Sequence, residues 1–423
     1  MEEDITHLMT RLVFQLALIL AAAKIGGEIS ERFLKVPPVL GELAAGALIG
    51  PFVLGGVDFP GIGPIFQNAA SEGSVIPVST EMWFIAQMGA VILLFHAGLE
   101  TNLKQFLRYA APASLVALGG VLIPFFLGAY GTVLLGPAEK ITDVEALFMG
   151  SILTATSIGI SVRVLRDIGS METPESVTIV AAAVIDDVLG ILILAVVVAI
   201  AVSGSVSASD VTIIGVKAVG LWLGITVVGL LLANHISKFV GLFNVPGAAL
   251  GLGLALAFFA AGLAEAFGLA MIIGAYSIGL ALSGSDLAHR LEDPLKSVDH
   301  ALVPVFFVVM GMMVDFGAVT SVLGFGVVIT ILAVLGKVVG AGAPAFFTGF
   351  NKLGAWRIGI GMMPRGEVAL IIAGIGLTRG VIEADLFGVS IMMTMVTTIL
   401  APIILVPAFR GGASGRRNEI SQS

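Results

Sequence analysis

Two carboxylates stand side by side near the middle of a long apolar run. The run SVTIVAAAVIDDVLGILILAVVVAIAV contains Asp186 and Asp187 and no other charged residue. An ionised side chain near the centre of a bilayer costs roughly 2.5 to 3.5 kcal/mol on insertion scales, so it needs a partner, a water-filled cavity or a function. Adjacent residues on a helix point about 100° apart, so the two acids cannot face one small ion in the same way. We therefore expect different roles for them.

Two other apolar runs also carry charged residues well inside. Lys337 lies in SVLGFGVVITILAVLGKVVGAGAPAFF, and Arg365 and Glu367 lie in IGIGMMPRGEVALIIAGIGL. We expect one aspartate to neutralise Lys337 across the bundle while the other stays open to water and binds a cation or a proton. A low-dielectric cavity favours the protonated carboxyl and a bound cation favours the charged one, so the two ions compete. Such competition is the physical core of an exchanger. The alternative is a purely structural ion-pair cluster.

A hydroxyl-rich stretch could supply further oxygen ligands. The run DVEALFMGSILTATSIGISVRVLRD contains Thr154, Thr156 and Ser157 and is a poor continuous membrane helix. Its hydroxyls and freed backbone carbonyls suit a small hard cation, although Ser and Thr also form ordinary hydrogen bonds between membrane helices. The run around Arg365 is interrupted as well, by MMPRGE. Interrupted segments at corresponding positions of two halves indicate a transporter binding site.

The ends of interrupted helices would leave partial charges of both signs in the middle of the membrane. Arg365 and Glu367 lie where compensation of these charges is needed. We therefore favour a structural role for both residues over direct ion binding.

The composition indicates that membrane-spanning helices position these charged and hydroxyl side chains. Of 423 residues 57% are apolar and only 12% are charged, with no cysteine and a net charge of -8. Runs of about 20 apolar residues, each long enough to cross a bilayer as a helix, recur from residue 8 to residue 409. This pattern excludes a soluble globular protein, disulfides, thiolate metal sites and a nucleic-acid surface. We expect one membrane transport domain over residues 1–423, with membrane lipid around it, no cofactor and no soluble regulatory domain.

The apolar runs predict thirteen membrane-spanning segments. They begin near residues 8, 37, 82, 110, 144, 175, 210, 245, 268, 300, 319, 353 and 386. The connections after odd-numbered segments hold most of the 21 Lys and Arg residues, which places the N-terminus outside and the C-terminus inside. The two interrupted segments are the fifth and the twelfth, so they run in opposite directions. We therefore expect an all-α polytopic fold with inverted repeats, pairing segments four to six with eleven to thirteen around two crossed discontinuous helices.

The remaining polar residues are expected to have ordinary roles. We expect Glu42 and Glu265 to reach the membrane interface and His96 to make an ordinary polar contact. A solvated cytoplasmic loop is expected at the charged residues Asp286, Arg290, Glu292, Asp293, Lys296 and Asp299. The alternative is that this cluster forms part of the cytoplasmic funnel or a pH-responsive surface.

At these motifs the sequence resembles the bacterial sodium/proton antiporters of the cation:proton antiporter superfamily, and especially the monovalent cation:proton antiporter-2 branch. The matching stretches are PPVLGELAAGALIGP, FHAGLET, LTATSIGISVRVLRDIG, AAAVIDDVLG, LGKVVGA and MMPRGEVALIIAGIGL. They occur in the order typical of that family and cover the chain.

The resemblance implies a homodimer in the inner (cytoplasmic) membrane in which a core moves like an elevator against a scaffold. The core would comprise roughly residues 82–203 and 300–409, and the scaffold roughly 8–56 and 210–285. By the family pattern Asp187 binds the cation or the proton, Asp186 pairs with Lys337, and Thr156 and Ser157 line the site; Asp187 and Thr156 would contact Na⁺. Some relatives have an acid at the position of Ser157.

The function expected from these features is exchange of a monovalent cation for protons, serving pH homeostasis. Sodium is favoured and lithium should compete. The resemblance implies electrogenic exchange, because relatives with a lysine at the position of Lys337 are generally electrogenic. The alternative is an electroneutral potassium/proton antiporter of the potassium-efflux type. An intramembrane aspartyl protease is disfavoured because its two acids must converge on one water from different helices. A cation channel is disfavoured because a buried Asp–Lys cluster opposes continuous permeation.

Overall fold

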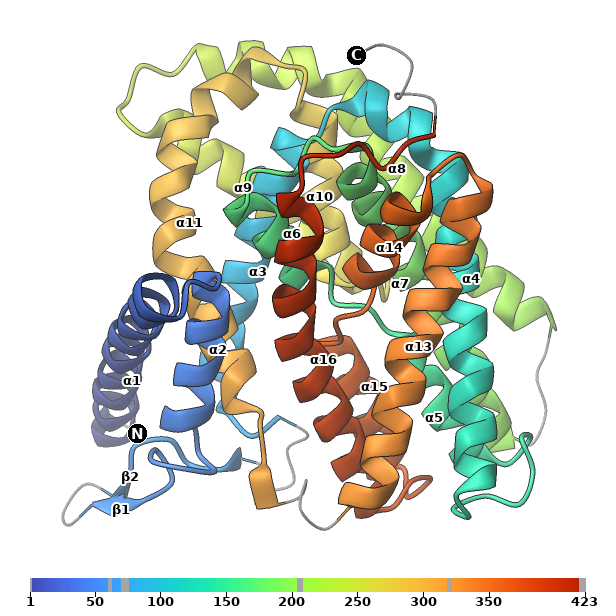
Figure 1. Cartoon of the computed structure of the whole chain (residues 1–423). Helices are drawn as coiled ribbons and strands as arrows, with labels where there is room; N and C mark the ends of the chain where they lie inside the picture. The colour runs from blue at the N-terminus through green and yellow to red at the C-terminus, as the bar shows by residue number, and fades with distance from the viewer. Residues whose placement is uncertain (1, 60–62, 70–75, 204–207, 318–321, 418–423) are drawn as a thin grey trace.

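The computed structural model describes residues 2–59, 63–69, 76–203, 208–317 and 322–417. They are almost entirely helical (Figure 1). In chain order the elements are α1 (Glu2–Ile29), the π-helix η1 (Ser30–Leu34), α2 (Pro38–Ile49), the antiparallel pair β1 (Asp58–Phe59) and β2 (Gly63–Pro64), α3 (Thr80–Glu100), α4 (Leu103–Leu134), α5 (Val144–Thr154), α6 (Ile158–Asp167), α7 (Pro174–Ser203), α8 (Ala208–Gly241), α9 (Ala248–Ala266), α10 (Met271–Leu282), α11 (Asp286–Met312), α13 (Leu323–Phe347), α14 (Lys352–Gly361), α15 (Glu367–Thr378) and α16 (Ala384–Arg410).

These helices account for the predicted membrane segments. Within the described ranges, ten helical segments are long and apolar enough to cross a membrane, one of them formed by α5 and α6 together. Shorter apolar helices are α2, α10 and the greater part of α15. Each of the thirteen predicted segments therefore corresponds to a helix or to a pair of half-helices. The start of α1 and the end of α16 lie at opposite ends of the bundle, as an odd number of crossings requires (Figure 1).

The two predicted interruptions are present. α5 ends at Thr154 and α6 begins at Ile158, while α14 ends at Gly361 and α15 begins at Glu367. Each break lies at Ser, Thr, Gly or Pro residues, which offer the backbone alternative hydrogen bonds or lack a backbone donor. The sets α4 to α7 and α13 to α16 therefore share one pattern, a broken helix between two continuous ones, and they run in opposite directions. The inverted-repeat prediction is confirmed.

The helices divide into two groups by their packing. α4 packs on α13, α5 and α7, and α16 packs on α13, α14 and α15. In the other group, α3 packs on α10 and α11, and α2 packs on α1 and α11. A Cβ added at Gly46 of α2 would lie 1.9 Å from the carbonyl oxygen of Val308, so glycine is required for the close approach of α2 to α11. Packing thus sets α3 and α11 beside the predicted scaffold helices.

One boundary prediction is wrong. The charged residues from Asp286 to Asp299 were expected to form a loop before a segment starting near residue 300, but they form the first half of α11. A helix of 27 residues is about 40 Å long and exceeds the apolar core of a bilayer by about 10 Å, so its first turns can be charged. The helix side of this stretch that includes Asp299 is buried, and Asp299 itself is only 3% exposed.

Candidate ion-binding site

The two helix breaks contact each other directly. The backbone N–H of Ser157 donates to the carbonyl oxygen of Pro364 at 2.8 Å. The Thr156 hydroxyl donates to Met362 O at 3.3 Å, and the Ser161 hydroxyl donates to Gly361 O at 2.5 Å. These bonds satisfy carbonyls that the break in the α14–α15 segment leaves without helical partners. The crossing therefore places extended, polar backbone within the bundle, where it is shielded from lipid.

A buried ion pair lies beside this crossing. Lys337 Nζ of α13 is 2.6 Å from Asp186 Oδ1 of α7, and the two residues are 0% and 1% exposed. The Thr156 hydroxyl lies within hydrogen-bond reach of the same carboxylate. The ion pair and the crossing are thus one continuous polar centre, assembled from α7, α13 and the break between α5 and α6.

Asp187 differs from Asp186 in what it faces. It is 7% exposed and lines a cavity of about 250 Å³. Trp83 and Gln87 of α3 and Glu265 at the end of α9 lie on the same cavity, as do residues of α10 and α15. Asp187 is also close enough to Lys337 for electrostatic attraction. The two neighbouring acids therefore have different surroundings, one in an ion pair and one at a cavity.

Ser157 presents a hydroxyl to the same centre. Its Oγ atom is buried and has no hydrogen-bond partner within the described part of the chain. A buried hydroxyl without a partner is unfavourable by about 1 to 3 kcal/mol, which suits an atom whose partner is a bound ion or water. Gly366, at the start of α15, packs against it: a Cβ added there would lie 2.7 Å from Ser157 Oγ and 2.9 Å from Ser157 Cβ.

We expect Gly366→Ala to damage this centre. The new methyl group must displace Ser157 or shift α15, which should lower stability by about 1 to 3 kcal/mol and weaken cation binding several-fold. Thermal unfolding and apparent cation affinity of the purified variant test this expectation. Gly262→Ala is a matched control, because a Cβ at Gly262 meets nothing within 4 Å. Equal unfolding temperatures and equal cation affinities in the two variants would contradict the contact between Gly366 and Ser157.

Arg365 satisfies backbone carbonyls at the crossing. Its guanidinium donates to Leu153 O at 2.9 Å, to Ala333 O at 3.0 Å and to Met363 O. Leu153 lies in the last turn of α5, where the helix dipole concentrates negative partial charge, so a buried cation is favourable there. This geometry supports the structural role expected of Arg365. Glu367 begins α15, but its side chain lies outside the described part of the structure.

A second charged cluster, which sequence reasoning missed, lies toward the end of the bundle where α6 ends. Glu42 of α2 is 2% exposed and accepts a hydrogen bond from Arg163 of α6 at 3.3 Å. Arg163 also contacts Asp167 at 3.2 Å. The expectation that Glu42 reaches the membrane interface is therefore wrong. Its carboxylate is buried because Arg163, 121 residues away in the sequence, lies against it.

The cluster continues to α3 and α11. Arg166 of α6 bonds Asp299 at 3.1 Å and contacts Glu100 at 3.2 Å, and one of its nitrogens lies 2.7 Å from His96 Nδ1. These residues therefore connect α6 to α2, α3 and α11. Glu100, Arg163 and Arg166 also border a cavity of about 540 Å³. The unusual density of charge in otherwise apolar segments was the available sequence signal.

Comparison with known proteins agrees with this architecture. The profile of the family described as "Sodium/hydrogen exchanger, transmembrane" matches residues 17–411. The chain belongs to this family. It is 35% identical to the Na(+)/H(+)-K(+) antiporter GerN of Bacillus cereus, with 94% of this chain and 96% of GerN covered. It is 34% identical to the high-affinity Na(+)/H(+) antiporter NhaS3 of Synechocystis, with 94% and 90% covered.

Solved structures show the same fold. The sodium proton antiporter MjNhaP1 from Methanocaldococcus jannaschii superposes with a TM-score of 0.71 at 20% sequence identity, and 96% of each chain is covered. The chain is therefore a polytopic membrane protein with an exchanger fold. Its relatives are named as antiporters, which are secondary transporters, and the protease alternative is excluded.

Proposed function

We propose that this protein exchanges Na⁺ for H⁺ and that Asp187 carries either ion in turn. The observation that carries the proposal is the pairing geometry of the two aspartates. Asp186 is neutralised by Lys337 at 2.6 Å, while the neighbouring residue Asp187 lines a cavity. The Ser157 hydroxyl, at the crossing of the two broken helices, is buried without a hydrogen-bond partner within the described residues. A carboxylate, hydroxyls and backbone carbonyls are the oxygen ligands that a small hard cation prefers. The names of GerN and NhaS3 support the same ions.

We infer alternating access, and the positions of the Asp187 cavity and of the Arg166 cluster support it. Successive helices alternate in direction, so the turn between α9 and α10, beside the Asp187 cavity, lies on the side of the N-terminus. The cluster around Arg166 lies on the opposite side and ties α6 to the α2, α3 and α11 group. With the predicted topology, these positions support a conformation in which Asp187 is reached from outside and the Arg166 cluster closes the inside. We infer that the elevator motion breaks the Arg163 and Arg166 contacts.

The boundary of the moving core follows the packing. We propose that α4 to α7 and α13 to α16 move together, a smaller core than the residues 82–203 and 300–409 that the resemblance implies. These helices contact one another and hold the ion pair and both half-helix breaks. The remaining helices would form the scaffold and, in the homodimer predicted from the resemblance, the contacts between two copies. Bacterial relatives support a location in the cytoplasmic membrane. Cross-linking and sizing of the purified protein test the dimer.

Ion choice and charge movement are tested in one assay. Purified protein in liposomes carrying an internal pH dye is exposed separately to sodium, lithium and potassium, with and without a clamped membrane potential. Sodium and lithium should drive proton movement, and the rate should depend on the potential, because Lys337 can release a proton when the cycle changes its pairing with Asp186. Proton movement driven by potassium alone, and independent of potential, would favour the electroneutral potassium alternative. The name of GerN includes K(+), which supports testing potassium as well.

Apparent sodium affinity should fall as the pH falls. Protons and sodium occupy the same Asp187 carboxylate, so each unit of pH lost in the range where that carboxyl binds a proton should weaken sodium binding by up to about tenfold. The half-saturating sodium concentration, measured from pH 6 to pH 9 under a clamped potential, checks the sign and the slope. A half-saturating concentration that does not change over this range would contradict competition at one carboxylate.

A further inference from the structure

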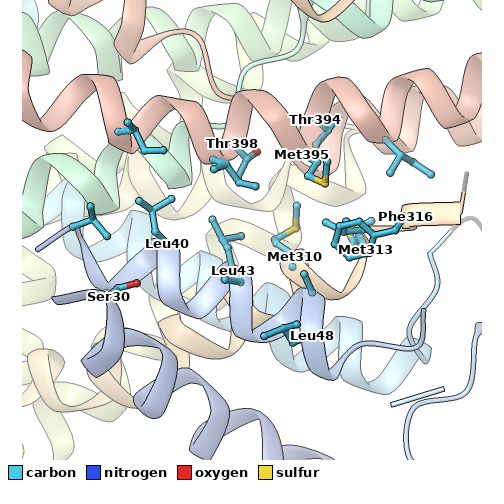
Figure 2. Close-up of a pocket in the computed structure, with 18 of the residues that line it drawn as sticks. Ser30, Leu40, Leu43, Leu48, Met310, Met313, Phe316, Thr394, Met395 and Thr398 are labelled. Carbon is cyan, nitrogen blue, oxygen red and sulfur yellow. The ribbon is translucent and has the colours of Figure 1, made fainter. Parts of the chain in front are cut away.

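Helix α16 lies between an apolar groove and the crossing of the two broken helices. The groove is bounded by α2, by the end of α11 and by α16. Figure 2 shows Thr394 and Thr398 of α16 on one side of it and Leu40 and Leu43 of α2 on the other. α16 packs instead on α13, α14 and α15. The contacts that position α16 are therefore those it makes with the helices of the proposed core.

Two adjacent threonines of α16, Thr397 and Thr398, satisfy both backbone groups of Arg365. The Arg365 N–H donates to Thr397 Oγ1 at 3.3 Å, and the Thr398 hydroxyl donates to the Arg365 carbonyl oxygen at 2.5 Å. The two threonines are buried, at 0% and 6% exposed. Arg365 lies in the break between α14 and α15, so its backbone groups are outside both half-helices. Each threonine thus replaces a hydrogen bond that the break removes.

The Thr398 hydroxyl departs from the usual pattern of a helical threonine. A Ser or Thr inside a helix commonly donates to the carbonyl oxygen four residues earlier, as Thr132 and Thr330 do at 2.8 and 2.7 Å. Thr398 donates to a different segment. Pro402, four residues further along α16, has no N–H for the Thr398 carbonyl oxygen. α16 therefore loses one of its own hydrogen bonds at the point where it bonds the break.

The residues on either side of Arg365 contact Ser157 of the other break. The Pro364 carbonyl oxygen accepts from the Ser157 N–H at 2.8 Å, and a Cβ added at Gly366 would lie 2.7 Å from Ser157 Oγ. The Arg365 guanidinium reaches the last turn of α5 by donating to Leu153 O. Because these groups are in direct contact, a shift of the Arg365 backbone must move the Ser157 hydroxyl or the end of α5.

We propose that Thr397 and Thr398 are positioning residues for cation binding, a role that rests on the ion site proposed above. They hold the backbone of Arg365, and its two neighbours set where the buried Ser157 hydroxyl lies. That hydroxyl has no hydrogen-bond partner among the residues that the structure describes, so it is available to a cation. Loss of either threonine hydroxyl should weaken cation binding. The maximal rate of ion exchange should stay close to that of the parent protein, because Asp187 is unchanged.

Isosteric substitutions in the full chain test the proposal. Thr397→Val and Thr398→Val keep the shape of each side chain and remove its hydroxyl. Peptides covering residues 362–366 should take up deuterium faster in both variants, a measurement that does not depend on which ion is carried. The half-saturating concentration of the transported cation in proteoliposomes should rise about three- to tenfold, the factor that one hydrogen bond is typically worth. Thr330→Val is the matched control and should change neither quantity, because Thr330 is also 6% exposed and its hydroxyl bonds its own helix.

Rescue and direct binding separate positioning from a purely structural role. Thr398→Ser restores the hydroxyl and should restore both the slow deuterium uptake and the cation affinity. Binding is measured independently of transport, as the rise in unfolding temperature of purified protein on adding sodium, lithium or potassium. Faster deuterium uptake with unchanged cation affinity would make the pair purely structural and overturn the proposal. Unchanged uptake in both valine variants, or no recovery in Thr398→Ser, would overturn it equally. Ion exchange that persisted in Asp187→Asn would contradict the ion site instead, so the two failures are distinguishable.

Discussion

Asp187→Asn is expected to reduce sodium-driven proton movement to the rate of liposomes without protein. Asparagine keeps the size of the side chain and can still accept a hydrogen bond, but it can neither bind a proton nor neutralise a cation at neutral pH. Because Asp186 is held by Lys337 at 2.6 Å, it cannot take over the task without breaking a buried ion pair. The measurement is the pH change inside proteoliposomes after a sodium jump.

The same variant should remain folded. Asp187 lies at a cavity, so replacing its charge removes a buried ionised group and leaves the Asp186 pair intact. The unfolding temperature of the variant should therefore equal or exceed that of the parent protein. Glu265→Gln, which changes another acid on the same cavity, is the matched control and should still transport. Sodium-driven exchange that persisted in Asp187→Asn would refute the site assignment. Equal loss in Glu265→Gln would show that transport needs both acids on the cavity and not Asp187 alone.

Lys337→Ala is expected to produce the largest loss of stability among these variants. It leaves the Asp186 carboxylate, which is 1% exposed, without its cation, and removal of one partner of a buried ion pair typically costs about 3 to 5 kcal/mol. Chemical or thermal unfolding of the purified protein measures the change. Lys140→Ala, at an exposed lysine, should change stability by less than about 0.5 kcal/mol.

A double variant distinguishes a broken pair from a lost side chain. Asp186→Asn combined with Lys337→Met removes both charges while keeping most of the volume, so much of the stability should return. Any transport that remains in the double variant should depend less on membrane potential, because the lysine proton is gone. An unchanged unfolding profile in Lys337→Ala would argue against the ion pair as a source of stability.

Hydropathy and charge alone identified the residues that needed an explanation. A carboxylate pair, a lysine and an arginine inside apolar runs are expensive in any arrangement, so their importance could be inferred without knowing their partners. The same reasoning located both helix breaks, because Pro364 and the Thr154 to Ser157 stretch disfavour a continuous membrane helix. It also gave thirteen crossings and the inverted repeat, which follow from counting apolar runs and their direction.

Which charged residues form pairs depends on the tertiary fold. Hydropathy gives the cost of burying Glu42 or Asp299 but says nothing of where Arg163 and Arg166 will lie, and the two pairs span 121 and 133 residues of sequence. We therefore expected an interfacial acid and a loop where the structure has buried ion pairs and the first half of α11. No sequence pattern predicts the groove between α2 and α16, because apolar residues occupy both the positions that face a groove and the positions that face lipid. Partners, cavities and grooves depend on how the helices cross, and that is set by the packing of the whole bundle.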